Sequence, residues 1–195
     1  MPAMPPKVQL DASLSLRTPR DFVRPRVSWP PDARDGSPMA VFLAEPYSSL
    51  EAADALCVEA GFVVLALRTD AFDVAAIAVE WAADHAKQLG ADPAGLLVAG
   101  GRLAAATALH ARDEGWPPLS RQVLIGPDLT GWPLAAASLA GVAPATVVNA
   151  PRYAARLRAA GVEVEELLAD RPTNFEWARG LSTSNADQEE HEDDR

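Results

Sequence analysis

The fold of this chain is decided by a strand, a turn and a helix that follow one another in LLVAGGRLAAATALHARDEG, residues 96–115. The apolar run 96–99 is typical of a strand that is buried on both faces of a sheet. Gly100 and Gly101 turn the chain, and the alanine-rich segment 102–114 then predicts a helix that Gly115 ends. A buried strand followed directly by a helix is the repeating unit of α/β proteins.

The same alternation continues on both sides of this stretch. Segment 71–89 carries apolar residues at helical spacing and ends before Gly90, so it predicts a long helix. Further strands are expected near 39–43, 62–67, 123–125, 145–148 and 162–168, and further helices near 48–60 and 153–160, with Ser48 and Ser49 as N-caps of the first. The chain is therefore expected to be α/β, with a mostly parallel sheet covered by helices on both faces.

Three regions are expected along the chain. Residues 1–35 are rich in proline and are expected to hold no more than a short edge strand, near 23–29. Residues 36–180 carry the alternating pattern and predict one domain. Residues 181–195 hold six acidic residues and one arginine, so this segment carries a net charge of −5, half of the net charge of −10. Such a charge run predicts a solvated, disordered tail.

The composition argues against several classes of function. Lysine and arginine form no basic stripe, so the sequence does not predict nucleic-acid binding. No apolar run reaches the roughly 18 residues that a membrane helix needs, and no secretory signal pattern opens the chain. Cys57 is the only cysteine and is expected to be a small core residue. We therefore expect a cytoplasmic protein without a metal or cofactor.

Four segments carry a resemblance to a known family. They are 81–100 (WAADHAKQLGADPAGLLVAG), 104–115, 122–127 (QVLIGP) and 153–162 (YAARLRAAGV). These are similar to the helix and strand before the nucleophile, the helix behind it, the next strand, and a later helix of hormone-sensitive-lipase-like esterases. The resemblance spans roughly residues 39–177. It implies an α/β-hydrolase fold and the hydrolysis of carboxylic esters.

The residues that should carry this chemistry differ from the family pattern. The nucleophile turn, Gly-x-Ser-x-Gly, is matched by GGRLA at 100–104, which places Arg102 at the serine position. An arginine stays protonated and cannot attack an acyl carbon. The oxyanion stretch, His-Gly-Gly-Gly, is matched by AEPY at 44–47. There Pro46 has no amide hydrogen, and Glu45 would repel an oxyanion.

The acid and the histidine of the triad are also missing from their expected places. Asn149 to Arg152 leads directly into the next helix without a carboxylate, and Asn174 is the match to the histidine. Asparagine cannot shuttle a proton near neutral pH. The cap region (129–142) and the last helix (176–181) are both short, which predicts an apolar sheet surface left uncovered. The sequence thus predicts a pseudoenzyme that forms a homo-oligomer or a complex with a related protein.

Two interpretations of Arg102 remain open. With Gly100 and Gly101 at a helix N-terminus, it is expected to bind a small anion such as phosphate or carboxylate. Alternatively, it fills the old pocket and forms a salt bridge with Glu45. A dinucleotide loop is not favoured, because no later glycine follows.

A second hypothesis is an ester hydrolase with relocated catalytic residues, such as Ser48 or Ser49. The three histidines argue against it, because His85 and His110 lie in predicted helices and His191 lies in the tail. No two of them have the spacing of metal ligands.

Overall fold

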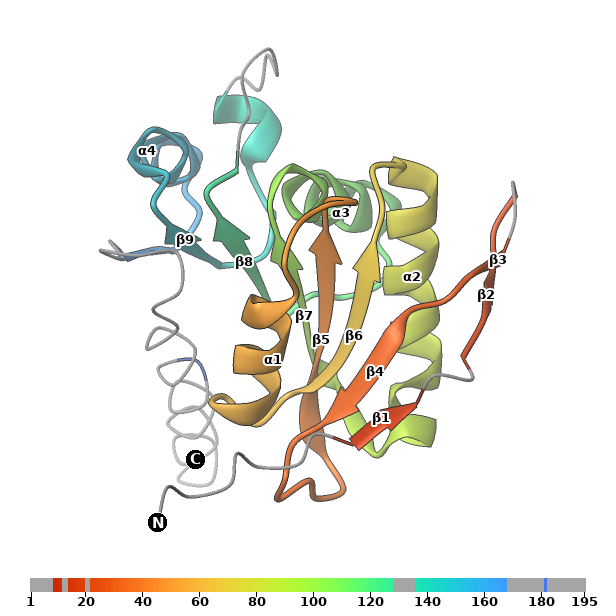
Figure 1. Cartoon of the computed structure of the whole chain (residues 1–195). Coiled ribbons are helices and arrows are strands. Elements are labelled where there is room, and N and C mark those ends of the chain that lie inside the picture. Colours follow the sequence, from red (N-terminus) through yellow and green to blue (C-terminus); the bar gives the residue numbers. More distant parts are fainter. Residues whose placement is uncertain (1–8, 12–13, 20–21, 128–135, 168–180, 182–195) are drawn as a thin grey trace, which may run out of the picture.

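The computed structural model describes residues 9–11, 14–19, 22–127, 136–167 and 181 (Figure 1). Its centre is an eight-stranded sheet in the order β1-β4-β6-β5-β7-β8-β9-β10. The strands from β5 to β10 pair in parallel, whereas β4 is antiparallel to both β1 and β6. Their bounds are β1 (Gln9–Asp11), β4 (Arg26–Trp29), β5 (Ser37–Ala44), β6 (Val63–Arg68), β7 (Ala91–Gly100), β8 (Arg121–Ile125), β9 (Ala145–Val148) and β10 (Val164–Leu167).

Helices cover the two faces of this sheet, as the alternating pattern predicts. In Figure 1, α1 (Glu51–Val58) lies on one face, and α2 (Phe72–His85) and α3 (Arg102–Glu114) lie on the other. Helix α4 (Pro151–Ala159) packs on the same core as α2 and α3. Two short 3-10 helices, Ala86–Leu89 and Ala136–Leu139, and a separate hairpin of β2 (Leu16–Arg17) and β3 (Phe22–Val23) complete the described elements. The α/β class is confirmed.

The central strands contribute side chains to a hydrophobic core on each face of the sheet, because successive side chains alternate between the faces. In β5, Val41 and Leu43 pack with α2 and α3, while Ala40 and Phe42 pack with α1. All of β5 from Met39 onward is buried. A strand with this double burial must be apolar throughout, which is why the sequence shows a continuous run here.

The N-terminal segment differs from its prediction. The strand expected near 23–29 forms as β4, but it is not an edge strand, because β1 pairs with its outer side and β6 with its inner side. Both β1 and β4 come from residues 1–35, so this segment contributes to the same sheet as the residues after it. The proline-rich composition does not reveal this pairing, since Pro25 and Pro30 flank β4 and do not interrupt it.

The start of α1 also differs. Neither Ser48 nor Ser49 caps it: the N-cap residue is Leu50, without a side-chain hydrogen bond. Residues 45–48 form a turn, with the amide of Ser48 3.0 Å from the carbonyl oxygen of Glu45, and this turn delays the helix. The Ser49 hydroxyl instead accepts a hydrogen bond from the amide of Glu51 at 3.1 Å.

The sheet face beside α1 is not left open where the structure describes it. Leu97, Ala99 and Val123 are buried there, and Leu181 packs in the same cluster with 3% of its surface exposed. The sequence analysis predicts an uncovered apolar sheet surface that would favour an oligomer. No such exposed surface is seen at these positions. Asn174, the acidic tail from 182 and part of the trimmed cap (128–135) lie outside the described residues.

Candidate functional site at the β7–α3 turn

The turn between β7 and α3 is built by two glycines. Gly100 has a φ of +140°, and a Cβ placed on it would lie 2.2 Å from the carbonyl oxygen of Leu43 on neighbouring β5. Only glycine fits both this backbone conformation and this approach. Gly101 occupies the N-cap position of α3, so Arg102 is the first residue of the helix.

A cavity of about 460 Å³ opens beside this turn, at the carboxyl ends of β5, β7 and β8. We call it the elbow pocket. Phe42 and Ile125 line it with apolar surface, and Ser48 and Ser49 line it from the segment before α1. The carboxyl edge of a parallel sheet is where α/β proteins bind their ligands. All four residues predicted to bind a ligand line this pocket, namely Gly100, Gly101, Arg102 and Glu45.

Arg102 and Glu45 do not neutralise each other. Both are exposed, and within the described part of the chain no ion pair joins them or links either to another residue. The predicted salt bridge across a closed pocket is thus not observed among these residues. Arg102 lines an open cavity.

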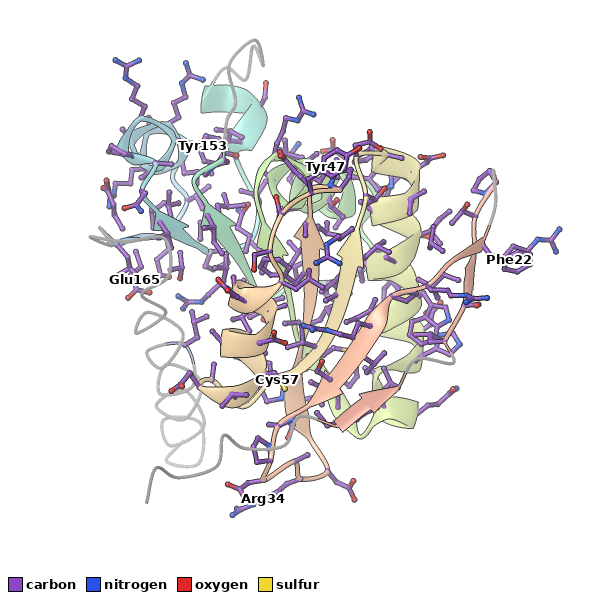
Figure 2. All side chains as sticks on the ribbon, in the orientation of Figure 1. Phe22, Arg34, Tyr47, Cys57, Tyr153 and Glu165 are labelled. Atoms are coloured by element: carbon purple, nitrogen blue, oxygen red, sulfur yellow. The ribbon has the colours of Figure 1, made fainter. Side chains whose placement is uncertain are left out.

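The segment that follows β5 leaves the sheet at once. Glu45, Pro46 and Tyr47 are exposed, and Tyr47 lies at the carboxyl end of the sheet, opposite Arg34 (Figure 2). The amide of Thr69 donates a hydrogen bond to the carbonyl oxygen of Ala44, with the two atoms 2.9 Å apart. The backbones that follow β5 and β6 therefore separate only after this point. Pro46 offers no amide hydrogen to an oxyanion.

The connection after β9 is as short as the sequence predicts. Two residues, Asn149 and Ala150, separate β9 from α4. Asn149 has a φ of +55°, and its amide donates to the carbonyl oxygen of Leu167 on β10 at 3.0 Å. The turn therefore closes without room for a loop that would carry a carboxylate.

The described histidines lie on α2 and α3. The Nδ1 atom of His85 lies 2.8 Å from the carbonyl oxygen of Trp81, and its ring stacks on that of Trp81 with centroids 4.3 Å apart. His110 meets the ring of Phe72 edge-on at 5.3 Å and lies 3.9 Å from Glu80. Neither lines the elbow pocket. Within the described residues, no three His, Cys, Asp or Glu side chains gather as a metal site.

Sequence reasoning missed the apolar walls of the pocket. Phe42, Ala52 and Ile125 line it, from β5, α1 and the end of β8. The alternation of β5 could indicate that Phe42 and Ala44 share a face. It could not show that this face opens into a cavity, because that depends on where α1 begins.

Comparison with known proteins agrees with this geometry. A family model described as alpha/beta hydrolase fold matches residues 69–145. The chain is 30% identical over 164 residues to esterase LipI of Mycobacterium tuberculosis, covering 73% of this chain and 51% of that protein. The chain thus spans about half the length of this curated relative.

Solved structures show the same fold. An esterase of the archaeon Pyrobaculum calidifontis superposes with a TM-score of 0.76 at 20% identity, covering 94% of this chain and 84% of that one. A thermostable esterase of Pseudomonas putida gives 0.73 at 20% identity, with 92% and 81% covered. The chain is an α/β hydrolase by fold. Within that class its sequence is similar to the hormone-sensitive-lipase-like esterases.

None of the helices in the described ranges has the length and apolar character to cross a bilayer.

Proposed function

We propose that this chain is a catalytically inactive member of its esterase family that binds a small anion in the elbow pocket. The observation that carries the proposal is Arg102, which lines the pocket at the turn where the family places its nucleophile. Acyl transfer requires an activated nucleophile at that point, and a guanidinium supplies none.

The hydroxyl groups in the pocket do not replace the lost serine. Ser48 and Ser49 both line it, but an activated serine needs a base within hydrogen-bond reach. The histidines of α2 and α3 contact Trp81, Phe72 and Glu80 instead.

Binding of an anion is supported by charge and shape. The fork of a guanidinium group matches carboxylate and phosphate oxygens in a bidentate manner. Arg102 stands at the first position of a thirteen-residue helix, whose N-terminal amides add partial positive charge. No carboxylate in the described residues pairs with it.

Activity is tested with p-nitrophenyl acetate and butyrate on the purified chain. We expect no turnover above the buffer rate and no covalent labelling by a fluorophosphonate probe, read by intact mass. The variants Ser48→Ala and Ser49→Ala separate the alternatives. Turnover that either one abolishes would establish a relocated hydrolase, and turnover that survives both would contradict both accounts.

Binding is tested by thermal stabilisation in phosphate and in acetate. We expect Arg102→Gln to remove most of the stabilisation that these small anions give. Arg34→Gln is the matched control, because Arg34 is an exposed arginine in the turn between β4 and β5, at the opposite end of the sheet (Figure 2). Equal stabilisation of the two variants would show that the elbow pocket is not the anion site.

A further inference from the structure

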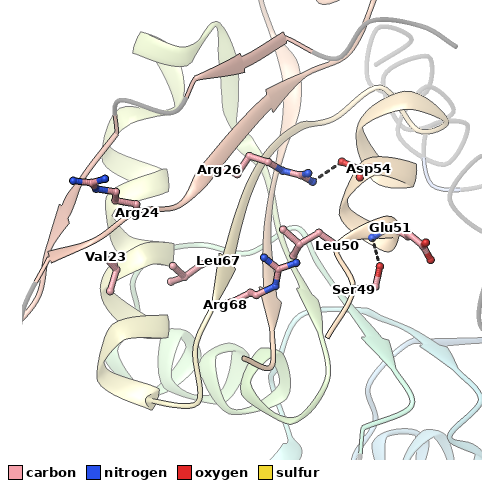
Figure 3. A pocket seen from close by; sticks show the side chains of 9 residues that line it. All are labelled: Val23, Arg24, Arg26, Ser49, Leu50, Glu51, Asp54, Leu67 and Arg68. Atoms are coloured by element: carbon pink, nitrogen blue, oxygen red, sulfur yellow. Dashed lines mark hydrogen bonds and ion pairs between the residues drawn. The ribbon is translucent and has the colours of Figure 1, made fainter. Parts of the chain in front are cut away.

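A second, larger cavity of about 590 Å³ lies beside the elbow pocket (Figure 3). We call it the arginine pocket. It is formed by the connection from β3 to β4, the end of β6 and the start of α1. Ser49 and Glu51 line both cavities, so the two are neighbours across the start of α1.

Three arginines line the arginine pocket. Arg26 is neutralised by an ion pair with Asp54 of α1. Arg68 donates from Nε to the carbonyl oxygen of Ser48 at 3.1 Å, a contact that orients its guanidinium but leaves the charge uncompensated. Arg24 forms no ion pair with any described residue. In Figure 3 the guanidinium of Arg24 points away from Arg68, and that of Arg68 lies between Leu67 and Leu50. Arg68 is therefore the cation available to a ligand in this pocket.

The pocket also has an apolar floor. Val23, Leu50 and Leu67 line it, and Leu67 is buried. In Figure 3, Leu67 and Leu50 lie between Arg24 on one side and Glu51 on the other, and the carboxylate of Glu51 points away from Arg68. The acidic side chain thus does not occupy the space in front of the Arg68 guanidinium.

From this combination we infer that the arginine pocket binds an organic carboxylate that carries a short aliphatic chain. The carboxylate would pair with Arg68, since guanidinium groups bind carboxylates in bidentate fashion. The chain would lie over Val23, Leu50 and Leu67. Each buried methylene strengthens such binding by about fourfold. The site therefore favours a longer carboxylate over acetate.

The test is a calorimetric titration of the whole chain with hexanoate, acetate and inorganic phosphate. We expect hexanoate to bind at one site per chain, at least about tenfold more tightly than acetate or phosphate. Arg68→Gln should weaken hexanoate binding at least about tenfold, and Leu50→Ala should reduce the advantage of hexanoate over acetate. Arg34→Gln should leave hexanoate binding unchanged.

Other outcomes overturn the inference in distinct ways. If phosphate binds as well as hexanoate, the apolar floor plays no part. If Arg102→Gln abolishes hexanoate binding and Arg68→Gln does not, the ligand occupies the elbow pocket, which contradicts this inference and leaves the proposed function standing. If hexanoate does not bind at all, the arginine pocket is not a carboxylate site. Thermal melts of each variant establish that it is folded.

Discussion

The interior of the sheet and the loops at its carboxyl edge differ in how closely they are packed. At Leu43 and Gly100 the two strand backbones approach so closely that no Cβ fits between them. A few residues further, Glu45, Tyr47 and Arg102 are exposed. The tightly packed interior carries the α/β-hydrolase fold, while the residues at the edge are open to solvent. The fold therefore does not by itself fix the chemistry at this edge.

The largest effect is expected where the interior is tightest. Gly100→Ala forces a Cβ against the carbonyl oxygen of Leu43 and a φ that alanine avoids, and should lower the free energy of unfolding by about 3 to 5 kcal/mol. Urea denaturation measures this loss, or the variant fails to accumulate as soluble protein.

The control separates the clash from the backbone conformation. Gly36 also has a positive φ, +90°, but nothing lies within 4 Å of its Cβ position. Gly36→Ala should therefore cost only about 1 to 2 kcal/mol. If the two variants were equally destabilised, the close approach of β5 and β7 would not be what makes Gly100 necessary.

A large effect is also expected on the α1 side of the core. Leu56 is fully buried in the cluster beneath α1, so Leu56→Ala should destabilise the fold by about 3 kcal/mol through the cavity it leaves. The exposed Tyr47 provides the contrast, since Tyr47→Ala should change stability by no more than about 0.5 kcal/mol. A shift in Tm for Tyr47→Ala as large as that for Leu56→Ala would mean that the edge is packed as tightly as the interior.

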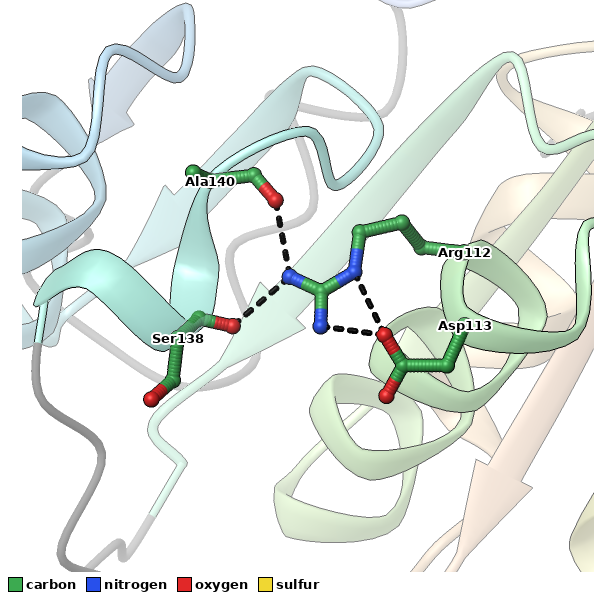
Figure 4. A network of polar contacts seen from close by, with 4 residues as sticks. All are labelled: Arg112, Asp113, Ser138 and Ala140. Atoms are coloured by element: carbon green, nitrogen blue, oxygen red, sulfur yellow. Dashed lines mark hydrogen bonds and ion pairs between the residues drawn. The ribbon is translucent and has the colours of Figure 1, made fainter.

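A smaller effect is expected where α3 holds the connection that leads to β9. Arg112 donates from Nη1 to the carbonyl oxygens of Ser138 and Ala140, both at 2.7 Å, while Asp113 orients its guanidinium (Figure 4). Arg112→Ala should cost about 1 to 2 kcal/mol, measured by urea denaturation. The surface pair of Arg158 with Glu166 is the control, and Arg158→Ala should cost about 0.5 kcal/mol or less. Equal losses would show that Arg112 acts only as a surface charge.

The smallest effect at neutral pH is expected from two buried groups whose ionisation makes stability depend on pH only in alkali. Burial raises the pKa of Cys57 from 9.0 to about 12, and burial also raises the pKa of Tyr153 to about 12. The unfolded chain loses these protons at lower pH than the folded chain does. Stability is therefore complete below pH 9 and falls as the pH rises toward 12.

Chemical denaturation at a series of alkaline pH values checks this dependence. Cys57→Ala should flatten the decline between pH 9 and 12, whatever it does to stability at neutral pH. Tyr47→Phe is the control and should leave the slope unchanged, because Tyr47 is exposed. A decline that Cys57→Ala leaves as steep would mean that the thiol ionises as readily in the folded chain as in the unfolded one.

Much of the fold could be predicted because its signals are local. The segment 102–114 is α3 with the same bounds, and 71–89 is α2 followed by a 3-10 turn that Gly90 ends with a φ of +75°. The position of β4 could not be predicted, because it depends on pairing with β1 on one side and β6 on the other. Nor could the start of α1, where a turn after β5 displaces the expected serine cap.

The sequence by itself determined which chemical groups stand at the β7–α3 turn and in the β9–α4 connection. Arg102 follows the glycine turn, and no carboxylate lies between Val148 and Tyr153; both are properties of the covalent chain. Only the tertiary structure decided which groups meet. Parallel pairing brings the ends of β5, β7 and β8 to one edge, so Glu45 and Arg102 share a cavity. The antiparallel pairing of β4 with β6 likewise gathers Arg24, Arg26 and Arg68. Contacts between residues so distant along the chain arise from strand order, which local patterns do not specify.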